Sequence, residues 1–315
     1  MLLSVMVEGQ EGVTWPHWLA LAGAAQRLGY AGLYRSDHYL SVVGSEERGA
    51  LDAWGTVCAL GPVTERIRLG TVVSPTSFRH PSVLAKLVVT ADHVSRGRAE
   101  LGLGAGWLEV EHRRYGFPFL STGERFDVLE EQLEVITRTW AEGPFSFTGE
   151  HYAIDGLDAQ PKPFQQPRPL LRLGGRGKRR GVALAARYAD EYNTVHQSPE
   201  QCATIRAALD DACVAAGRDP ADLPLSLMTG FVVGADEAEL RDRAKEVLDW
   251  LGRPADDLDA ALQELRASWL VGTPDQIGER LAEYGRAGVT HVMLQHHLYE
   301  DDAALELIAE RLIPG

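Results

Sequence analysis

The regular alternation of short apolar runs with amphipathic helical segments constrains the fold of this chain more than any other feature of its sequence. Strict alternation of strands and helices favours a parallel sheet. Eight such units in about 300 residues fit a closed (β/α)8 TIM barrel better than a doubly wound α/β sheet, which is the alternative. The predicted strands are Leu2–Val7, Gly32–Arg35, Ile67–Val73, Arg98–Leu103, Leu170–Leu173, Glu191–Val195, Leu225–Val233 and Val289–Leu294.

The helix signals between these runs support a single domain over residues 1–315. Thr14 precedes a helix with an early proline, and Ser121 with Glu124 forms a capping-box pair. Another capping box begins at Thr273, and the stretch from Asp236 to Ala267 is helical and charged. Residues 143–169 contain five prolines, so we expect an insertion there after the fourth strand–helix unit, as a loop or lid.

Composition excludes several classes of function. A net charge of −14 argues against binding to nucleic acid or to an anionic membrane surface. Cys58, Cys202 and Cys213 are sparse and form no CxxC pair, which indicates neither a disulfide framework nor a zinc site. The first residues do not resemble a signal peptide, and no apolar run is long enough to span a bilayer, so we expect a cytoplasmic protein.

Polar and glycine-rich residues follow the predicted strands, where the loops of such barrels carry their chemistry. His38 follows the second strand and could move a proton near neutral pH, although it could also be a loop histidine braced by Asp37. Val72-Val73-Ser74 ends the third strand. The glycines from Gly102 to Gly106 would let a flat ligand approach the backbone, but they do not form the dinucleotide fingerprint.

A basic, glycine-rich turn follows the fifth strand and leads into a helix. Its backbone N–H groups, the helix N-terminus and the four cations from Arg176 to Arg180 predict a phosphate site that is not a P-loop. Asn193 and His196 lie near the end of the sixth strand, and His296 and His297 follow the eighth. No acidic residues accompany these histidines with metal-ligand spacing, so no metal site is expected.

Several segments together resemble the bacterial-luciferase-like flavin and deazaflavin oxidoreductase family, over nearly the whole chain. They are YAGLYRSDH, RIRLGTVVSPTSFRHPSVLAKLVV, GRAELGLGAGW, GERFDVLEEQLEVI, PLLRLGGRGKRRGVALAARYADEYN and LVGTPDQIGERLAEYGRAGVTHVMLQ. The likeness is greatest to the branch that uses the deazaflavin coenzyme F-420. It implies a (β/α)8 barrel, a homodimer, and a cofactor ring at the carboxyl ends of the strands.

The resemblance also implies roles for individual residues. His38 would be catalytic, in proton transfer or charge stabilisation, and Trp107 and Tyr115 would line the substrate pocket. Val72, Val73 and Ser74 would back the ring, often through a non-prolyl cis peptide. The cofactor-binding set is Asp37, Val72, Val73, Ser74, Gly104, Ala105, Gly106, Gly174, Gly175, Arg176, Gly177, Lys178 and Asn193.

One departure bears on the reaction. The deazaflavin-dependent sugar-phosphate dehydrogenases of this family carry a catalytic glutamate directly after the fourth-strand glycines, where this chain has Trp107. Glu109 and Glu111 lie close by but out of register. The tryptophan suggests a more apolar substrate pocket, bounded by the loops at 41–50, 107–120 and 143–169.

The leading hypothesis is hydride transfer between coenzyme F-420 and a small organic substrate, such as an imine, an enone or a carbonyl compound. The four basic residues suit the longer anionic tail of the deazaflavin. The first alternative is a monooxygenase that uses reduced FMN and molecular oxygen. A non-catalytic barrel that binds a cofactor is the alternative from another class.

Overall fold

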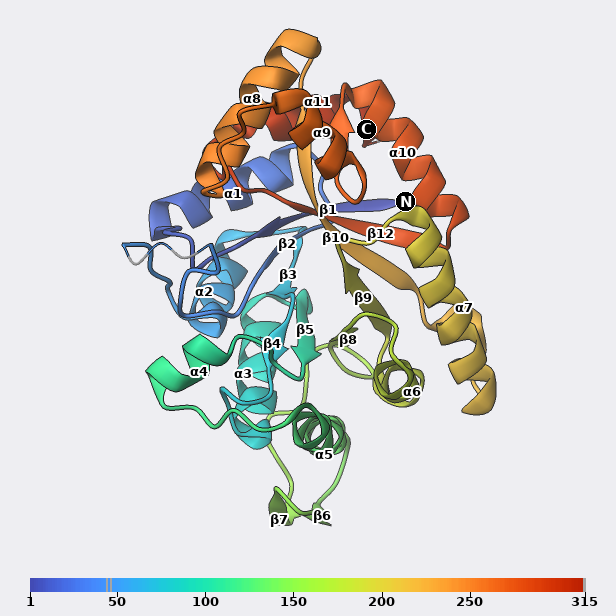
Figure 1. Cartoon of the computed structure of the whole chain (residues 1–315). Helices are drawn as coiled ribbons and strands as arrows, with labels where there is room; N and C mark the ends of the chain where they lie inside the picture. Colours follow the sequence, from blue (N-terminus) through green and yellow to red (C-terminus); the bar gives the residue numbers. More distant parts are fainter. Residues whose placement is uncertain (44, 46, 314–315) are drawn as a thin grey trace.

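Parallel strands close into a ring at the centre of the molecule, and helices surround it (Figure 1). The computed structural model describes residues 1–43, 45 and 47–313. Within these residues the ring runs β1-β2-β3-β5-β8-β9-β10-β12, and it closes because β12 pairs with β1. The ring strands are β1 (Leu2–Val7), β2 (Gly32–Arg35), β3 (Arg68–Thr71), β5 (Ala99–Gly104), β8 (Leu170–Gly174), β9 (Glu191–Val195), β10 (Leu225–Val233) and β12 (Val289–Gln295).

The helices follow the strands as the sequence predicts. The capping boxes at Ser121 and Thr273 are both present, and others begin at Thr14 and Ser198. The long helices are α1 (Trp15–Arg27), α2 (Ala53–Leu60), α3 (Pro81–Val94), α5 (Thr122–Trp140), α6 (Arg179–Tyr188), α7 (Pro199–Ala215), α8 (Glu237–Trp250), α9 (Leu258–Arg266), α10 (Pro274–Arg286) and α11 (Asp302–Leu312). The (β/α)8 barrel prediction is confirmed.

Several short elements went unpredicted, because local sequence patterns signal them weakly. They are β4 (Ser74–Pro75), β11 (Leu270–Gly272), α4 (Glu109–Tyr115) and the two 3-10 turns Gly61–Val63 and Pro220–Asp222. The predicted helical stretch from Asp236 to Ala267 is two helices, since the chain turns at Gly252 with φ at +67°.

The proline-rich insertion contains an antiparallel hairpin, β6 (Phe145–Thr148) with β7 (Ala153–Leu157). After the hairpin the chain runs along α3. Lys86 donates to the carbonyl of Gln160, and the Asp92 carboxylate accepts from the backbone N–H groups of Phe164 and Gln165. The insertion is therefore confirmed. Its hairpin is held by Glu131 of α5, and the segment after the hairpin flanks α3. Its hairpin turn, at His151 and Tyr152, lines a cavity near the site.

The interior of the barrel contains a buried ionic cluster below the mouth. Arg172 bonds Glu100 at 2.9 Å and Glu191 at 2.5 Å, and Tyr34 donates to Glu100 at 2.8 Å. His291 lies within 3.5 Å of Glu191. The charges are compensated in place, which is what burial of ionised groups requires. No described helix is both long and apolar enough to cross a membrane.

Candidate active site

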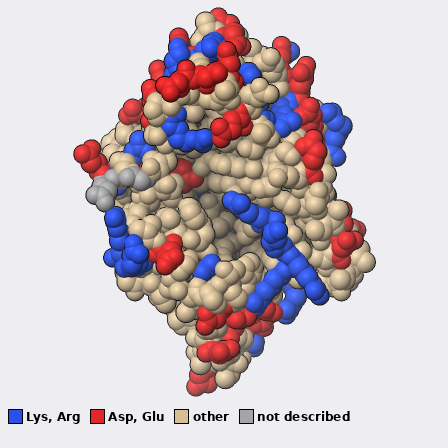
Figure 2. Space-filling view, in the orientation of Figure 1, with Lys and Arg blue, Asp and Glu red and all other residues tan. Residues whose placement is uncertain are grey.

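The carboxyl ends of the ring strands surround a hollow on one face of the molecule (Figure 2). The predicted site residues lie in or directly after β2, β3, β5, β8 and β9. Residues 44 and 46, within the loop 41–50 that was predicted to bound the substrate pocket, lie outside the described residues.

The peptide bond between Val72 and Val73 is cis, as the resemblance implies. The Val73 side chain occupies space that three neighbouring glycines leave open. A Cβ on Gly104 would lie 2.8 Å from it, and one on Gly102 or Gly174 would lie 3.0 Å away. These glycines therefore make room for Val73, a role that sequence reasoning did not consider. Contact of Gly104 and Gly174 with a cofactor stays a prediction.

His38 is held by a carboxylate from a distant part of the chain. Its Nδ1 lies 2.8 Å from Oε2 of Glu111, a residue of α4 whose side chain is fully buried. The other oxygen of Glu111 accepts from the backbone N–H groups of Tyr39 and Leu40. An imidazole fixed in this way has one orientation and, when neutral, one tautomer, with Nε2 left for a ligand.

The pair shifts the acidity of both groups. Burial alone lowers the pKa of His38, but the hydrogen bond and charge of Glu111 outweigh it, so the pKa lies above its usual value. Burial raises the pKa of Glu111, but His38 and the two backbone N–H groups bring it below the usual value. The arrangement favours a protonated His38 beside an ionised Glu111, which suits proton donation at the mouth.

Glu111 was not predicted as a site residue, although the sequence carried a signal. Leu108, Glu111, His112 and Tyr115 follow helical spacing, and Glu111 and His112 are buried within α4. A carboxylate at a buried helical position needs a partner. The sequence could not show that the partner is His38, which is 73 residues away.

Asp37 is buried below the mouth in a hydrogen-bonded network. Its carboxylate accepts from Ser74 at 2.6 Å and from Arg79 at 2.5 Å, and Trp54 donates to Ser74 at 3.0 Å. Asp37 and Ser74 therefore fix the end of β2 against the segment after β3. Their direct contact with a cofactor stays a prediction.

The basic turn after β8 divides into two groups of cations. Arg180 bonds Asp127 at 2.5 Å and Glu130 at 3.4 Å on α5, so its inclusion with the phosphate-binding cations is a correction. Arg176, Lys178 and Arg179 are exposed and have no ion pair within the described chain. Figure 2 shows Lys and Arg side chains gathered over α6 beside the hollow.

The glycines of this turn pack tightly on the barrel wall. A Cβ on Gly175 would lie 2.3 Å from the Tyr192 hydroxyl, which accepts a hydrogen bond from the Gly177 N–H at 2.9 Å. Gly177 has φ at +69°. Lys178 gives α6 no side-chain cap, so the N–H groups of its first turn are available to an anion.

The other predicted residues lie around the mouth, except for Asn193, which lies inside the barrel. The ring of Trp107 is 64% exposed and meets His38 edge-on, with centroids 5.8 Å apart. Tyr115 is 50% exposed and stacks on Tyr39. Asn193 is buried and donates to Ser226 inside the barrel. Gly106 has φ at +78° beside Ala105.

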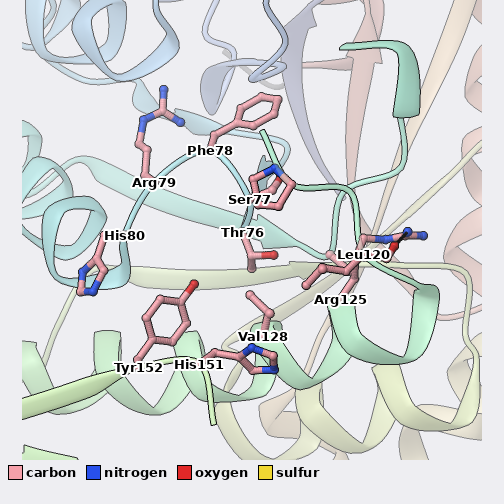
Figure 3. Close-up of a pocket in the computed structure, with 12 residues that line it drawn as sticks. Thr76, Ser77, Phe78, Arg79, His80, Leu120, Arg125, Val128, His151 and Tyr152 are labelled. Atoms are coloured by element: carbon pink, nitrogen blue, oxygen red, sulfur yellow. Dashed lines mark hydrogen bonds between the residues drawn. The ribbon is translucent and has the colours of Figure 1, made fainter. Parts of the chain in front are cut away.

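A cavity of about 360 Å³ extends from Ala105 outward, between the segment after β4 and α5 (Figure 3). Thr76 and Tyr152 approach each other across it, and Arg125 lies beside Leu120. The Arg125 Nε and the His151 Nε2 are buried without a hydrogen-bond partner in the described chain. A second cavity, of about 540 Å³, lies at the ends of β1, β9 and β12.

Comparison with known proteins identifies the family to which these features correspond. The model of the luciferase-like monooxygenase family matches residues 3–291. An FMNH(2)-dependent dimethylsulfone monooxygenase of Pseudomonas putida is 28% identical over 262 residues, which cover 75% of this chain and 70% of that protein. A coenzyme F-420-dependent glucose-6-phosphate dehydrogenase of Microbacterium testaceum is 27% identical, over 92% of this chain and 90% of the dehydrogenase.

Other relatives match over shorter segments, and solved structures share the fold. Uncharacterized mycobacterial proteins are 35% identical over 169 residues, which span 58% of their length. The coenzyme F-420-dependent tetrahydromethanopterin reductase of Methanopyrus kandleri superposes with a TM-score of 0.81, at 19% identity, over 100% of this chain and 99% of the reductase. This likeness concerns the barrel alone.

Proposed function

Because this chain belongs to the luciferase-like monooxygenase family, we propose that it transfers a hydride between the deazaflavin coenzyme F-420 and a small organic substrate, of the imine, enone or carbonyl type. Relatives that use F-420 and relatives that use FMNH(2) both match it. The basic turn after β8 is the observation that supports F-420 over FMN. Arg176, Lys178 and Arg179 stay free of acidic partners within the described chain and suit the longer anionic tail of the deazaflavin.

The residues at the mouth fit such a cofactor in chemistry and in shape. The uncapped first turn of α6 and the three cations supply donors for a phosphate. Val73 supports an apolar platform, which a flat ring requires beneath it. We therefore expect the platform to hold the ring and the turn to hold the tail.

The chain's own contribution to the reaction is orientation and a proton. Bound coenzyme F-420 supplies hydride chemistry. His38, held at Nδ1 by Glu111, presents Nε2 to the mouth, where it would deliver a proton to the substrate heteroatom. We assign the catalytic role to His38 and a positioning role to Glu111.

The second candidate is a monooxygenase that uses reduced FMN. The description of the matching family and the dimethylsulfone monooxygenase relative favour it. FMN has a shorter tail with a terminal phosphate, and the first turn of α6 could bind that group as well.

Titration of the purified protein with coenzyme F-420 and, separately, with FMN tests the proposal, with cofactor fluorescence as the readout. We expect tight binding of the deazaflavin and weak binding of FMN. Tight binding of FMN alone would reject the deazaflavin assignment and favour the monooxygenase. Tight deazaflavin binding without hydride transfer to any imine, enone or carbonyl compound would favour a non-catalytic barrel.

A further inference from the structure

The larger cavity at the mouth has two aromatic walls. Trp250 comes from the end of α8 and Trp269 from the residue before β11, and the His297 ring lies between them. The centroids of His297 and Trp269 are 5.0 Å apart and their planes differ by 20°, whereas Trp250 lies 5.1 Å from His297. Val42 and Leu265 add aliphatic surface. The Arg48 guanidinium covers part of the Trp250 ring, 4.5 Å from its centroid. The aromatic surface that remains uncovered favours a flat apolar molecule.

One carboxylate of the lining, that of Glu8, has no cation within ion-pair distance in the described chain. Glu8 follows β1 and accepts hydrogen bonds from two neutral amides, those of Gln10 and Gln295. No ion pair of the described chain includes Glu8. The other charged residues of the lining, Arg253 and Glu264, bond each other at 2.9 Å.

The histidines in the lining do not compensate Glu8. His196 lies 2.8 Å from the Gln295 side-chain oxygen, and burial lowers its pKa. Burial lowers the pKa of His297 to about 3, so this ring is neutral at physiological pH. Arg176 exerts its charge on His196 from the basic turn but does not line the cavity. The charges of Arg35 and His38 also act on Glu8, but neither residue lines the cavity. The lining itself therefore carries one net negative charge.

We propose that this cavity binds an organic cation, whose charged nitrogen faces Glu8 and whose apolar body lies against Trp250 and Trp269. The aromatic faces and the carboxylate together recognise a cationic nitrogen better than either does alone. The inference rests on the proposed function and narrows it, because among imines, enones and carbonyl compounds only the imine is basic enough to be a protonated cation near neutral pH. The same negative charge disfavours phosphorylated or carboxylated substrates.

Three bicyclic probes of similar size test the proposal on the cofactor-free protein by isothermal titration calorimetry. They are N-methyldihydroisoquinolinium, which is a cation, tetralone, which is neutral, and naphthoate, which is an anion. We expect the cation to bind about tenfold more tightly than tetralone, with naphthoate weakest, since tenfold corresponds to about 1.4 kcal/mol, within the range for a charge pair near a protein surface.

Variants at two positions test whether Glu8 causes the preference for the cation. Glu8→Gln keeps the size of the side chain and should weaken cation binding about tenfold, while the tetralone affinity changes less than about twofold. Glu246→Gln, an exposed residue of α8, removes the same charge away from the lining and should leave all three affinities unchanged. If Glu8→Gln is unstable to heat, Val43→Lys provides the test instead, because a cation in the lining brings its net charge to zero and should abolish the preference for the cation over tetralone.

Any of four results would overturn the inference. The natural protein could bind all three probes equally, bind naphthoate more tightly than the cation, or bind none of them. The order of the three affinities could also stay unchanged in both Glu8→Gln and Val43→Lys. Cofactor titrations on the same samples separate it from the proposed function. Tight deazaflavin binding without a preference among the probes rejects only the substrate class. A cation preference without binding of either cofactor rejects only the proposed function.

Discussion

At the scale of single residues, the pairing of His38 with Glu111 gives the site its most specific chemistry. A lone histidine after a strand has no fixed tautomer, whereas this ring is held at Nδ1 by a buried carboxylate. The carboxylate is itself held by the N–H groups of Tyr39 and Leu40. The geometry therefore favours proton transfer through Nε2.

Glu111→Gln should lower kcat about 10²-fold, in the range typical of general acid catalysis, and shift the pH profile. Glu111 raises the pKa of His38, so the protonated ring persists to higher pH in the natural protein. Removal of the carboxylate should lower that pKa, and activity should be lost at a lower pH as the pH rises. The kcat–pH profiles of both proteins check this.

Glu109→Gln is the matched control for that experiment. Glu109 is on the same helix but exposed, so its profile should match that of the natural protein. Identical profiles for Glu111→Gln and the natural protein would contradict the positioning role.

Gly104→Ala should destabilise the protein by about 1–3 kcal/mol and weaken cofactor binding, because the added Cβ would lie 2.8 Å from Val73. Gly23→Ala, in the middle of α1 with no heavy atom within 4 Å of the added Cβ, should instead stabilise by about 0.5–1 kcal/mol. Chemical denaturation measures both. Full stability and full cofactor affinity of the Gly104→Ala protein would show that Val73 does not support the cofactor ring.

At the scale of elements, the cations of the loop between β8 and α6 point in two different directions. Arg180 points to α5, and the remaining cations stay free at the start of α6 within the described chain. Cations at a helix N-terminus oppose its dipole, so their placement calls for an anion. Neighbouring residues of one turn thus have different functions.

The paired variant Arg176→Ala with Lys178→Ala should weaken cofactor binding about tenfold or more, and salt should affect this affinity less than that of the natural protein. Arg180→Ala removes one cation of the same turn and should change the affinity little, because its partners are Asp127 and Glu130. Fluorescence titrations at two salt concentrations measure the effect. Equal effects of both variants would disprove the division of this turn.

At the scale of the whole molecule, the ionic cluster inside the barrel links strands on opposite sides of the ring. Arg172 of β8 bonds Glu100 of β5 and Glu191 of β9, and Tyr34 of β2 joins through Glu100. The cluster lies below the mouth and ties the closed sheet together, so its loss affects the whole fold.

Arg172→Met should cost about 3–5 kcal/mol, because buried Glu191 loses its arginine and buried Glu100 keeps only Arg68, at 3.4 Å. Arg187→Ala removes an exposed pair with Glu130 and should cost at most about 1 kcal/mol. Denaturation curves compare the two proteins. Similar losses would show that the cluster is not the stabilising feature.

Stability should also fall in acid. Burial raises the pKa of Glu191, but the charge of Arg172 and the His291 contact outweigh it, so the folded-state pKa lies below the usual value. A depressed carboxylate contributes stability above its unfolded pKa of about 4.3, and that contribution declines as the pH falls below it. The Arg172→Met protein should lose this part of the acid dependence.

We also propose that the protein is a homodimer, as the family resemblance implies. Light scattering on a size-exclusion column should then give a mass of two 34.5 kDa chains, whereas a single-chain mass at micromolar concentration would contradict the proposal.

The sequence by itself determined the barrel and the position of the mouth. Both depend on local patterns, namely capping residues such as Ser121 and Thr273 and the alternation of apolar runs, which are encoded within a few residues. The order of elements then places every strand end at one face, so His38, Val73 and the turn from Gly174 to Lys178 were found together.

Only the tertiary structure decided which side chains meet. His38 meets Glu111 across 73 residues, and Gln295 meets Glu8 across 287. Arg180 turns to α5, and Val73 fills the space above the glycines. These contacts form only when the ring closes and helices pack against it. Side-chain direction follows from that packing, which no local pattern in the sequence encodes.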